Sequence, residues 1–150
     1  MDGFKFDSKA EAAYYLKLKR AGHSFDQNDE KHVVMQKFIP IQKAVTLKTG
    51  EKVLAVRYKA DFIFCNNGEI EKVVDVKGYQ DSESQLKMKM FAVTYGYPVT
   101  FAKYDHRSGI FEEMTCFESV RRQNKRAKER RERKKRRIVN DETIQGQNEL

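Results

Sequence analysis

The chain has 150 residues, enough to bury the core of one domain but too few for two folded domains. Its two cysteines, Cys65 and Cys116, lack the paired spacing of a zinc knuckle or a disulfide framework, and no stretch approaches the roughly 20 apolar residues of a membrane span. We therefore expect a soluble, cytoplasmic protein with no membrane partner. Residues 1–120 hold 18 basic and 17 acidic residues, against 12 and 5 in residues 121–150, so the tail carries most of the +8 charge.

The first half of the chain predicts one helix followed by strands. Ser8 and Glu11 form a Ser-x-x-Glu capping box, and apolar residues then recur at helical spacing up to Gly22. Residues 32–41, with Pro40 near the end, and residues 44–47 are typical of strands, and Thr49-Gly50 predicts a turn.

The middle of the chain predicts an antiparallel hairpin. Residues 53–64 are rich in β-branched and aromatic side chains, Asn66-Asn67-Gly68 is typical of a tight turn, and residues 70–76 continue as a second strand. After a break at 78–82, helical spacing resumes over 84–95, and two short strands are expected at 99–104 and 110–114. This order predicts an α/β (α+β) fold with a central mixed sheet flanked by helices.

The tail from Arg121 to Arg137 is almost entirely charged. Its good helix formers permit a helix, but without an apolar stripe it cannot pack into a core. We expect a folded domain over residues 1–120 and a basic tail, helical or disordered, over residues 121–150.

Charged residues converge on the predicted hairpin. Alternation places Lys59 and Asp61 on one face of their strand, and Asp75 and Lys77 on one face of the next. Buried carboxylates need partners or a metal ion to offset the loss of hydration. Mg²⁺ prefers oxygen ligands and keeps several waters, so Asp61, Asp75 and the Val76 carbonyl would suffice to hold it. Lys77 would position or activate the water that attacks a phosphodiester.

These residues resemble a known nuclease signature. Tyr58-Lys59-Ala60-Asp61-Phe62, followed after a turn by Val74-Asp75-Val76-Lys77-Gly78, is similar to the split motif of the PD-(D/E)XK, restriction-endonuclease-like superfamily, with Ala60 in place of the proline. The preceding Ser8-Lys9-Ala10-Glu11 helix resembles the start of small phage-encoded members. The resemblance covers roughly residues 4–104.

The resemblance implies a Mg²⁺-dependent DNA endonuclease, with Mn²⁺ able to substitute and no small-molecule cofactor. It makes Glu11 a further catalytic metal ligand, and it implies a homodimer, because relatives include Holliday-junction resolvases and transposon end-cleaving nucleases. Flap, junction and linear duplex all remain open as substrates. Glu11 is equally explained as the third residue of the capping box.

DNA contacts are expected from two sources. The resemblance places Gln36 near the site and Lys87 and Lys89 against DNA, although Gln36 also suits a strand end and the lysines a solvated helix face. In the tail, a dense run of basic residues binds phosphates by releasing counterions, without sequence preference. The expected nucleic-acid contacts are Lys9, Gln36, Lys87, Lys89, Arg121, Arg122, Lys125, Arg126, Arg130, Arg131, Lys134 and Lys135.

A rival interpretation belongs to another class. The chain could be a non-catalytic DNA- or RNA-binding protein whose basic tail binds and whose acidic cluster forms ordinary ion pairs. Cleavage that depends on Asp75 separates the two hypotheses.

Overall fold

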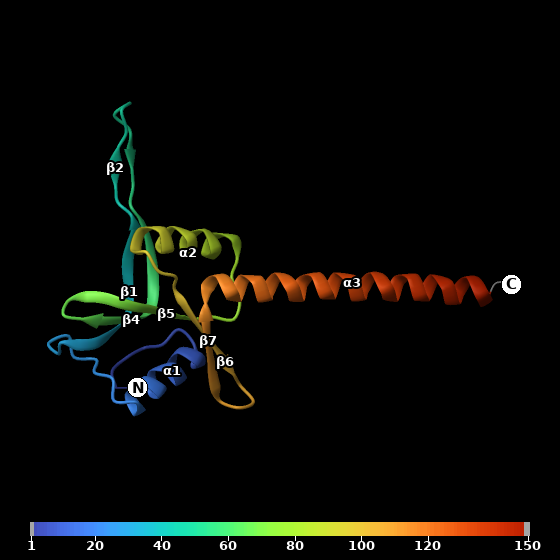
Figure 1. Ribbon diagram of the computed structural model, residues 1–150, viewed down its shortest axis with the longest axis horizontal. Coiled ribbons are helices and arrows are strands. Elements are labelled where there is room, and N and C mark those ends of the chain that lie inside the picture. The colour runs from blue at the N-terminus through green and yellow to red at the C-terminus, as the bar shows by residue number, and fades with distance from the viewer. Residues whose placement is uncertain (1, 149–150) are drawn as a thin grey trace. The chain divides into compact units, whose positions relative to one another are not determined.

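The computed structural model describes residues 2–148 (Figure 1). The chain divides into two compact units, with the boundary between Cys116 and Phe117. The first unit is an α+β domain with a mixed sheet flanked by helices, as the sequence predicts. Its elements are α1 (Lys9–Arg20), β1 (Lys31–Gln42), β2 (Val45–Thr46), β3 (Lys52–Val53), β4 (Val56–Asn66), β5 (Glu69–Val76), α2 (Ser82–Tyr95), β6 (Thr100–Asp105) and β7 (Ile110–Thr115).

The five-stranded sheet has the order β1-β4-β5-β6-β7. The β4–β5 hairpin is antiparallel, as expected, and Asn67 and Gly68 turn its corner with φ of 51° and 80°, values that suit a tight two-residue turn. Strands β5 and β6 run parallel because α2 connects them, which makes the sheet mixed.

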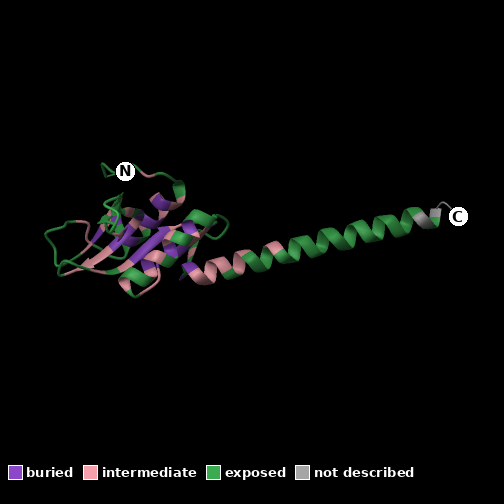
Figure 2. Cartoon of the chain, turned by 90° about the horizontal axis from the view of Figure 1, so that it is seen from above, coloured by how far each residue is buried: buried purple, intermediate pink, exposed green. Residues whose placement is uncertain are grey.

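Both faces of the sheet are covered. Val73 and Val74 are consecutive on β5, so their side chains point to opposite faces, and both are fully buried. On one face Tyr14 of α1 packs against Phe62, with ring centroids 4.9 Å apart. On the other, Phe91 of α2 contacts Tyr58 at 6.1 Å. Figure 2 shows this buried core within the first unit.

The sequence placed the strand ends imprecisely around the β2–β3 loop. The strand expected over residues 53–64 is divided into β3 and β4, because the chain leaves the ladder at Leu54 and Ala55. The strand expected to end near Pro40 runs on to Gln42, with a shift of register between these two residues. Proline is tolerated there because β1 is an edge strand.

Helix α2 begins two residues before its expected start. Asp81 caps it by accepting a hydrogen bond from the Ser84 backbone N–H at 2.7 Å. Gly96 ends it with φ of 81°, a left-handed conformation that favours glycine.

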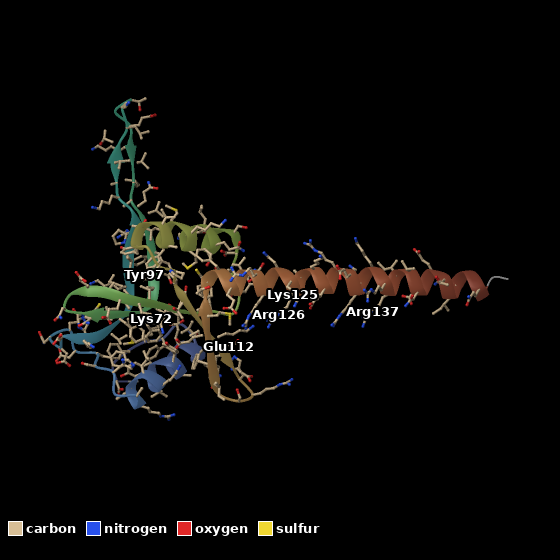
Figure 3. All side chains as sticks on the ribbon, viewed as in Figure 1. Lys72, Tyr97, Glu112, Lys125, Arg126 and Arg137 are labelled. Atoms are coloured by element: carbon tan, nitrogen blue, oxygen red, sulfur yellow. The ribbon has the colours of Figure 1, made fainter. Side chains whose placement is uncertain are left out.

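The second unit is a single helix. Helix α3 spans Cys116–Asn148, so it starts five residues before the charged run that suggested it. Residues 128–145 are all exposed, and Figure 3 shows the side chains of Lys125, Arg126 and Arg137 extending from the helix. A basic helix without a buried stripe suits a segment in contact with water or a polyanion.

Candidate active site

The hairpin brings Asp61 and Asp75 together. Phe62 pairs with Val74 in the β4–β5 ladder, so the residues just outside that pair, Asp61 and Asp75, become neighbours. Asp61 Oδ2 accepts a hydrogen bond from the Val76 backbone N–H at 2.8 Å, and Asp75 is close enough to raise the pKa of Asp61. This is the convergence that the sequence predicts.

The two carboxyl groups cannot both be ionised at little cost. Burial, reinforced by the hydrogen bond and charge of Asp75, raises the pKa of Asp61 to about 9. The Val76 N–H opposes this rise, and the charge of Glu11 adds to it. The pair therefore holds a proton at neutral pH unless a cation replaces it.

Tyr58 completes the surroundings of Asp75. Its hydroxyl donates a hydrogen bond of 2.9 Å to Asp75 Oδ2, and both side chains are buried. Burial, with the charge of Asp75, raises the pKa of Tyr58 well above its ordinary value, so the phenol remains a donor. Strand alternation predicts Tyr58 and Asp61 on opposite faces of β4, so it offered no signal that Tyr58 contacts Asp75.

Lys77 lies at the open side of the pair. Its Nζ is 3.9 Å from Asp75 Oδ2 and 3.3 Å from Ser84 Oγ at the start of α2. Lys77 and Ser84 border an open hollow of about 250 Å³. Its other lining residues are Tyr58, Lys59, Asp81, Glu83, Lys87 and Met88. The Lys77 ammonium group therefore lies near Asp75 and borders an accessible space.

Glu11 lies close enough to the site for its charge to raise the pKa of Asp61. The capping box forms as expected, because the Glu11 N–H donates to Ser8 Oγ at 3.1 Å. The buried Glu11 carboxylate accepts hydrogen bonds from Ser8 Oγ, the Asp7 N–H and Gln36 Nε2, the last at 3.3 Å. Gln36 adopts φ of 49° inside β1, an unusual conformation for a residue with a side chain. Capping is thus confirmed for Glu11, and its role as a metal ligand stays a prediction.

Within residues 2–148, no three His, Cys, Asp or Glu side chains lie together as a metal-binding group. The metal ligands predicted from the sequence are the Asp61 and Asp75 carboxylates, the Val76 carbonyl and Glu11, and these assignments stay predictions.

The lysines expected near the site differ in their surroundings. Lys59 does not join Asp61 but forms an ion pair of 3.1 Å with Asp7. Lys87 borders the hollow and pairs with Glu83 at 2.8 Å. Lys9 and Lys89 are exposed. The expected contacts of the tail all lie on α3, where Arg122 pairs with Glu118 at 2.7 Å.

Sequence reasoning missed three supporting residues, Tyr58, Asp81 and Ser84. Asp81 carried a usable signal, because Asp is favoured just before a helix, where its side chain accepts a hydrogen bond from a backbone N–H of the first turn.

No helix in the described part of the chain is long and apolar enough to cross a membrane.

Comparison with known proteins gives one match. No curated protein and no solved structure is significantly similar to the chain. A family model described as "Protein of unknown function (DUF1064)" matches residues 1–107, which include Glu11, Asp61, Asp75 and Lys77 and end before α3. Because the match spans more than half of the chain, this protein belongs to the DUF1064 family.

Proposed function

We propose that this protein is a Mg²⁺-dependent DNA endonuclease of the PD-(D/E)XK type. The observation that carries the proposal is the juxtaposition of Asp61 and Asp75 on neighbouring strands, with Lys77 Nζ at 3.9 Å from Asp75. Two adjoining carboxylates beside a lysine, on neighbouring strands, combine a cation site with a donor to phosphate or water. An ordinary surface ion pair would not need a second, buried carboxylate.

The donor set fits Mg²⁺. Asp61 and Asp75 offer hard oxygen ligands, and a divalent cation would relieve the repulsion that raises the pKa of Asp61 to about 9. The bound ion would polarise the scissile phosphate and lower the pKa of a coordinated water. Mn²⁺ has the same preference for oxygen ligands and should substitute.

The chain's own residues would do the remaining work of hydrolysis. A water oxygen forms a bond to phosphorus, one P–O ester bond breaks, and the leaving alcohol takes up a proton. Lys77, held by Ser84 Oγ, can donate to the phosphate or orient the water. Tyr58 fixes Asp75 by its buried hydrogen bond, as supporting residues do around metal ligands.

Helix α3 would add affinity for DNA. Between residues 116 and 148 it holds twelve basic residues and five acidic ones, so phosphates are the natural ligand. The family match ends at residue 107, so this contribution is separate from the catalytic part. Sequence preference would have to come from the folded unit.

The proposal is tested by incubating the purified chain with labelled four-way junction, flap and linear duplex DNA, in Mg²⁺ or EDTA. We expect Mg²⁺-dependent cutting that Asp75→Asn reduces by at least about 10³-fold, given typical losses at catalytic groups. Binding of DNA by this variant should persist. Glu69→Gln removes an exposed carboxylate elsewhere on β5 and serves as the matched control.

Two results would contradict the proposal. DNA that is bound but never cut, with Mg²⁺ or Mn²⁺ across pH, would leave a non-catalytic nucleic-acid-binding protein. Cutting that survives Asp75→Asn unchanged would place the catalytic centre elsewhere.

A further inference from the structure

The end of β1, the β2–β3 loop and the start of β4 form a strongly basic ribbon. We call residues 37–59 the basic ribbon. They hold six basic residues and one acidic residue, whereas the rest of residues 1–116 hold 12 basic and 15 acidic residues. Its charged members are Lys37, Lys43, Lys48, Glu51, Lys52, Arg57 and Lys59. The positive charge of the first unit is therefore gathered in this segment.

The basic ribbon extends beyond the five-stranded sheet as a pair of antiparallel strands. Strand β5 pairs with β4 only as far as Phe62, so beyond this point β1 and β4 pair with each other alone. Figure 1 shows these strands leading into β2 and β3. Val45 pairs with Val53 and Thr46 with Lys52, which continues the antiparallel arrangement.

The basic ribbon leads along β4 to the candidate active site. Phe38 pairs directly with Lys59, so these two side chains share a face, and Asp61 follows Lys59 by two residues on the same strand. Tyr58 and Ile39 pair on the opposite, buried face. Asp61 lies four residue steps along β4 from Arg57, about 13 Å at 3.3 Å per step.

Phe38 gives this face an aromatic surface. Its side chain is 56% exposed, although phenylalanine is a large hydrophobic residue that proteins usually bury. The Arg57 guanidinium lies over its ring, 5.3 Å from the centroid. An exposed ring beside a cation suits a nucleotide, whose base can stack and whose phosphate can pair with the guanidinium.

We propose that the basic ribbon binds DNA that contains unpaired nucleotides, with a base stacked on Phe38 and the backbone along Arg57 and the ribbon lysines. This inference rests on the proposed nuclease function and narrows its substrate class to DNA with a single-stranded segment near the cut, as at a flap or an open branch. About 13 Å corresponds to roughly four base steps of B-DNA at 3.4 Å each. The unpaired nucleotide therefore lies within a few steps of the scissile phosphate.

Charge favours DNA over a second copy of this chain as the occupant. Two ribbons packed against each other would bring two segments of net charge +5 together, and like charges oppose such a contact. A fully paired duplex would satisfy the lysines but would offer no free base face to Phe38.

The first experiment uses the absence of tryptophan from the chain. In Phe38→Trp, the introduced indole becomes a specific fluorophore at the proposed stacking position. We expect its emission to be quenched on titration with a flap DNA in EDTA, where no cutting occurs, and to change little with a fully paired duplex of equal length. Ile110→Trp places the same fluorophore on an exposed position of β7 and should not respond to either DNA.

The second experiment measures affinity by the same titration, with labelled DNA in EDTA. Phe38→Leu keeps an apolar side chain but removes the ring, and it should weaken binding of flap DNA about 5- to 100-fold, with little effect on duplex. Phe38→Tyr retains the ring and should bind as the unsubstituted chain does. Circular dichroism of each variant confirms that the fold is intact.

The outcomes separate this inference from the proposed function. Unchanged emission of Phe38→Trp with flap DNA, or equal losses of flap and duplex binding in Phe38→Leu, would overturn the stacking surface even if the protein cuts DNA. A change of oligomeric state on Phe38→Leu, measured by light scattering without DNA, would overturn it in favour of a second copy. Selective flap binding through Phe38 without any cutting would support the surface and defeat the nuclease.

Discussion

At the scale of single residues, the site is defined by an electrostatic conflict. Asp61 and Asp75 lie side by side on the inner strands β4 and β5, where Asp61 is half-buried and Asp75 is buried. A folded protein tolerates such a pair by sharing a proton or by binding a cation. The same conflict makes the site sensitive to both pH and metal.

The pH dependence of stability should follow from Asp61. In the unfolded chain its pKa is near the ordinary value of 3.8, and in the metal-free fold it is about 9. Between these values the folded state holds a proton that the unfolded state has released, so metal-free stability should decrease as pH rises from 4 to 9. Asp61→Asn should flatten this dependence, as measured by thermal unfolding in EDTA across pH. A pH profile that Asp61→Asn leaves unchanged would contradict the shared proton.

Replacing Tyr58 tests how Asp75 is held. Tyr58→Phe removes the buried donor to Asp75 Oδ2, so we expect about 1 kcal/mol less stability and cleavage reduced about 10- to 100-fold. Tyr97→Phe is the matched control, because the Tyr97 hydroxyl donates to the Ile70 carbonyl away from the site. Chemical denaturation and cleavage rates measure both effects. Equal cleavage by the two variants would show that the hydroxyl of Tyr58 does not position Asp75.

At the scale of elements, the start of α2 connects helix capping to the position of Lys77. Asp81 caps the helix through the Ser84 N–H, and Ser84 Oγ accepts from Lys77 Nζ. The residue that caps α2 is therefore connected to Lys77, the candidate catalytic lysine, through the side chain of Ser84.

The cap can be tested by substitution. Asp81→Ala should lower the stability by about 0.5–2 kcal/mol and should also reduce cleavage, because the first turn that holds Ser84 would fray. Asp81→Ser keeps a capping oxygen and should restore most of both. Thermal unfolding and initial rates provide the measurements, and a loss of stability with full cleavage would disconnect the cap from Lys77.

At the scale of the whole molecule, the chain combines a folded unit with a basic helix. Residues 2–116 contain the sheet, both flanking helices and all four candidate catalytic residues, whereas α3 contributes charge. Folding and catalysis should therefore belong to the first unit, and much of the salt-dependent affinity to the second.

Deletion of residues 121–150 should separate these contributions. We expect the remaining chain to unfold cooperatively and to cut DNA, but to bind it more weakly, with a shallower salt dependence. Each lost phosphate contact should lower the slope of log K against log salt by about 0.9. Replacing Lys134, Lys135, Arg136 and Arg137 with glutamine tests charge with the helix retained. An unchanged salt slope in both variants would exclude α3 from the DNA interface.

Much of this protein could be predicted from sequence because the relevant signals are local. The capping box of α1, the Asn67-Gly68 turn and the alternation of β4 and β5 each follow from a few neighbouring residues, and together they place Asp61 beside Asp75. The order of helices and strands likewise predicts a mixed sheet flanked by helices.

The tertiary structure alone decided which distant residues meet. Tyr58 reaches Asp75, Gln36 reaches Glu11, and Lys59 turns to Asp7, because the strands and helices that bring them together are far apart in the chain and periodicity describes only one element at a time. The exposure of Phe38 beside Arg57 was also hidden, since an aromatic residue in a strand normally predicts burial. The sequence by itself thus determined the helices, the strands and the pairing of Asp61 with Asp75. Three-dimensional packing determined which side chains hold these two residues in place, and it determined the exposed surface around Phe38.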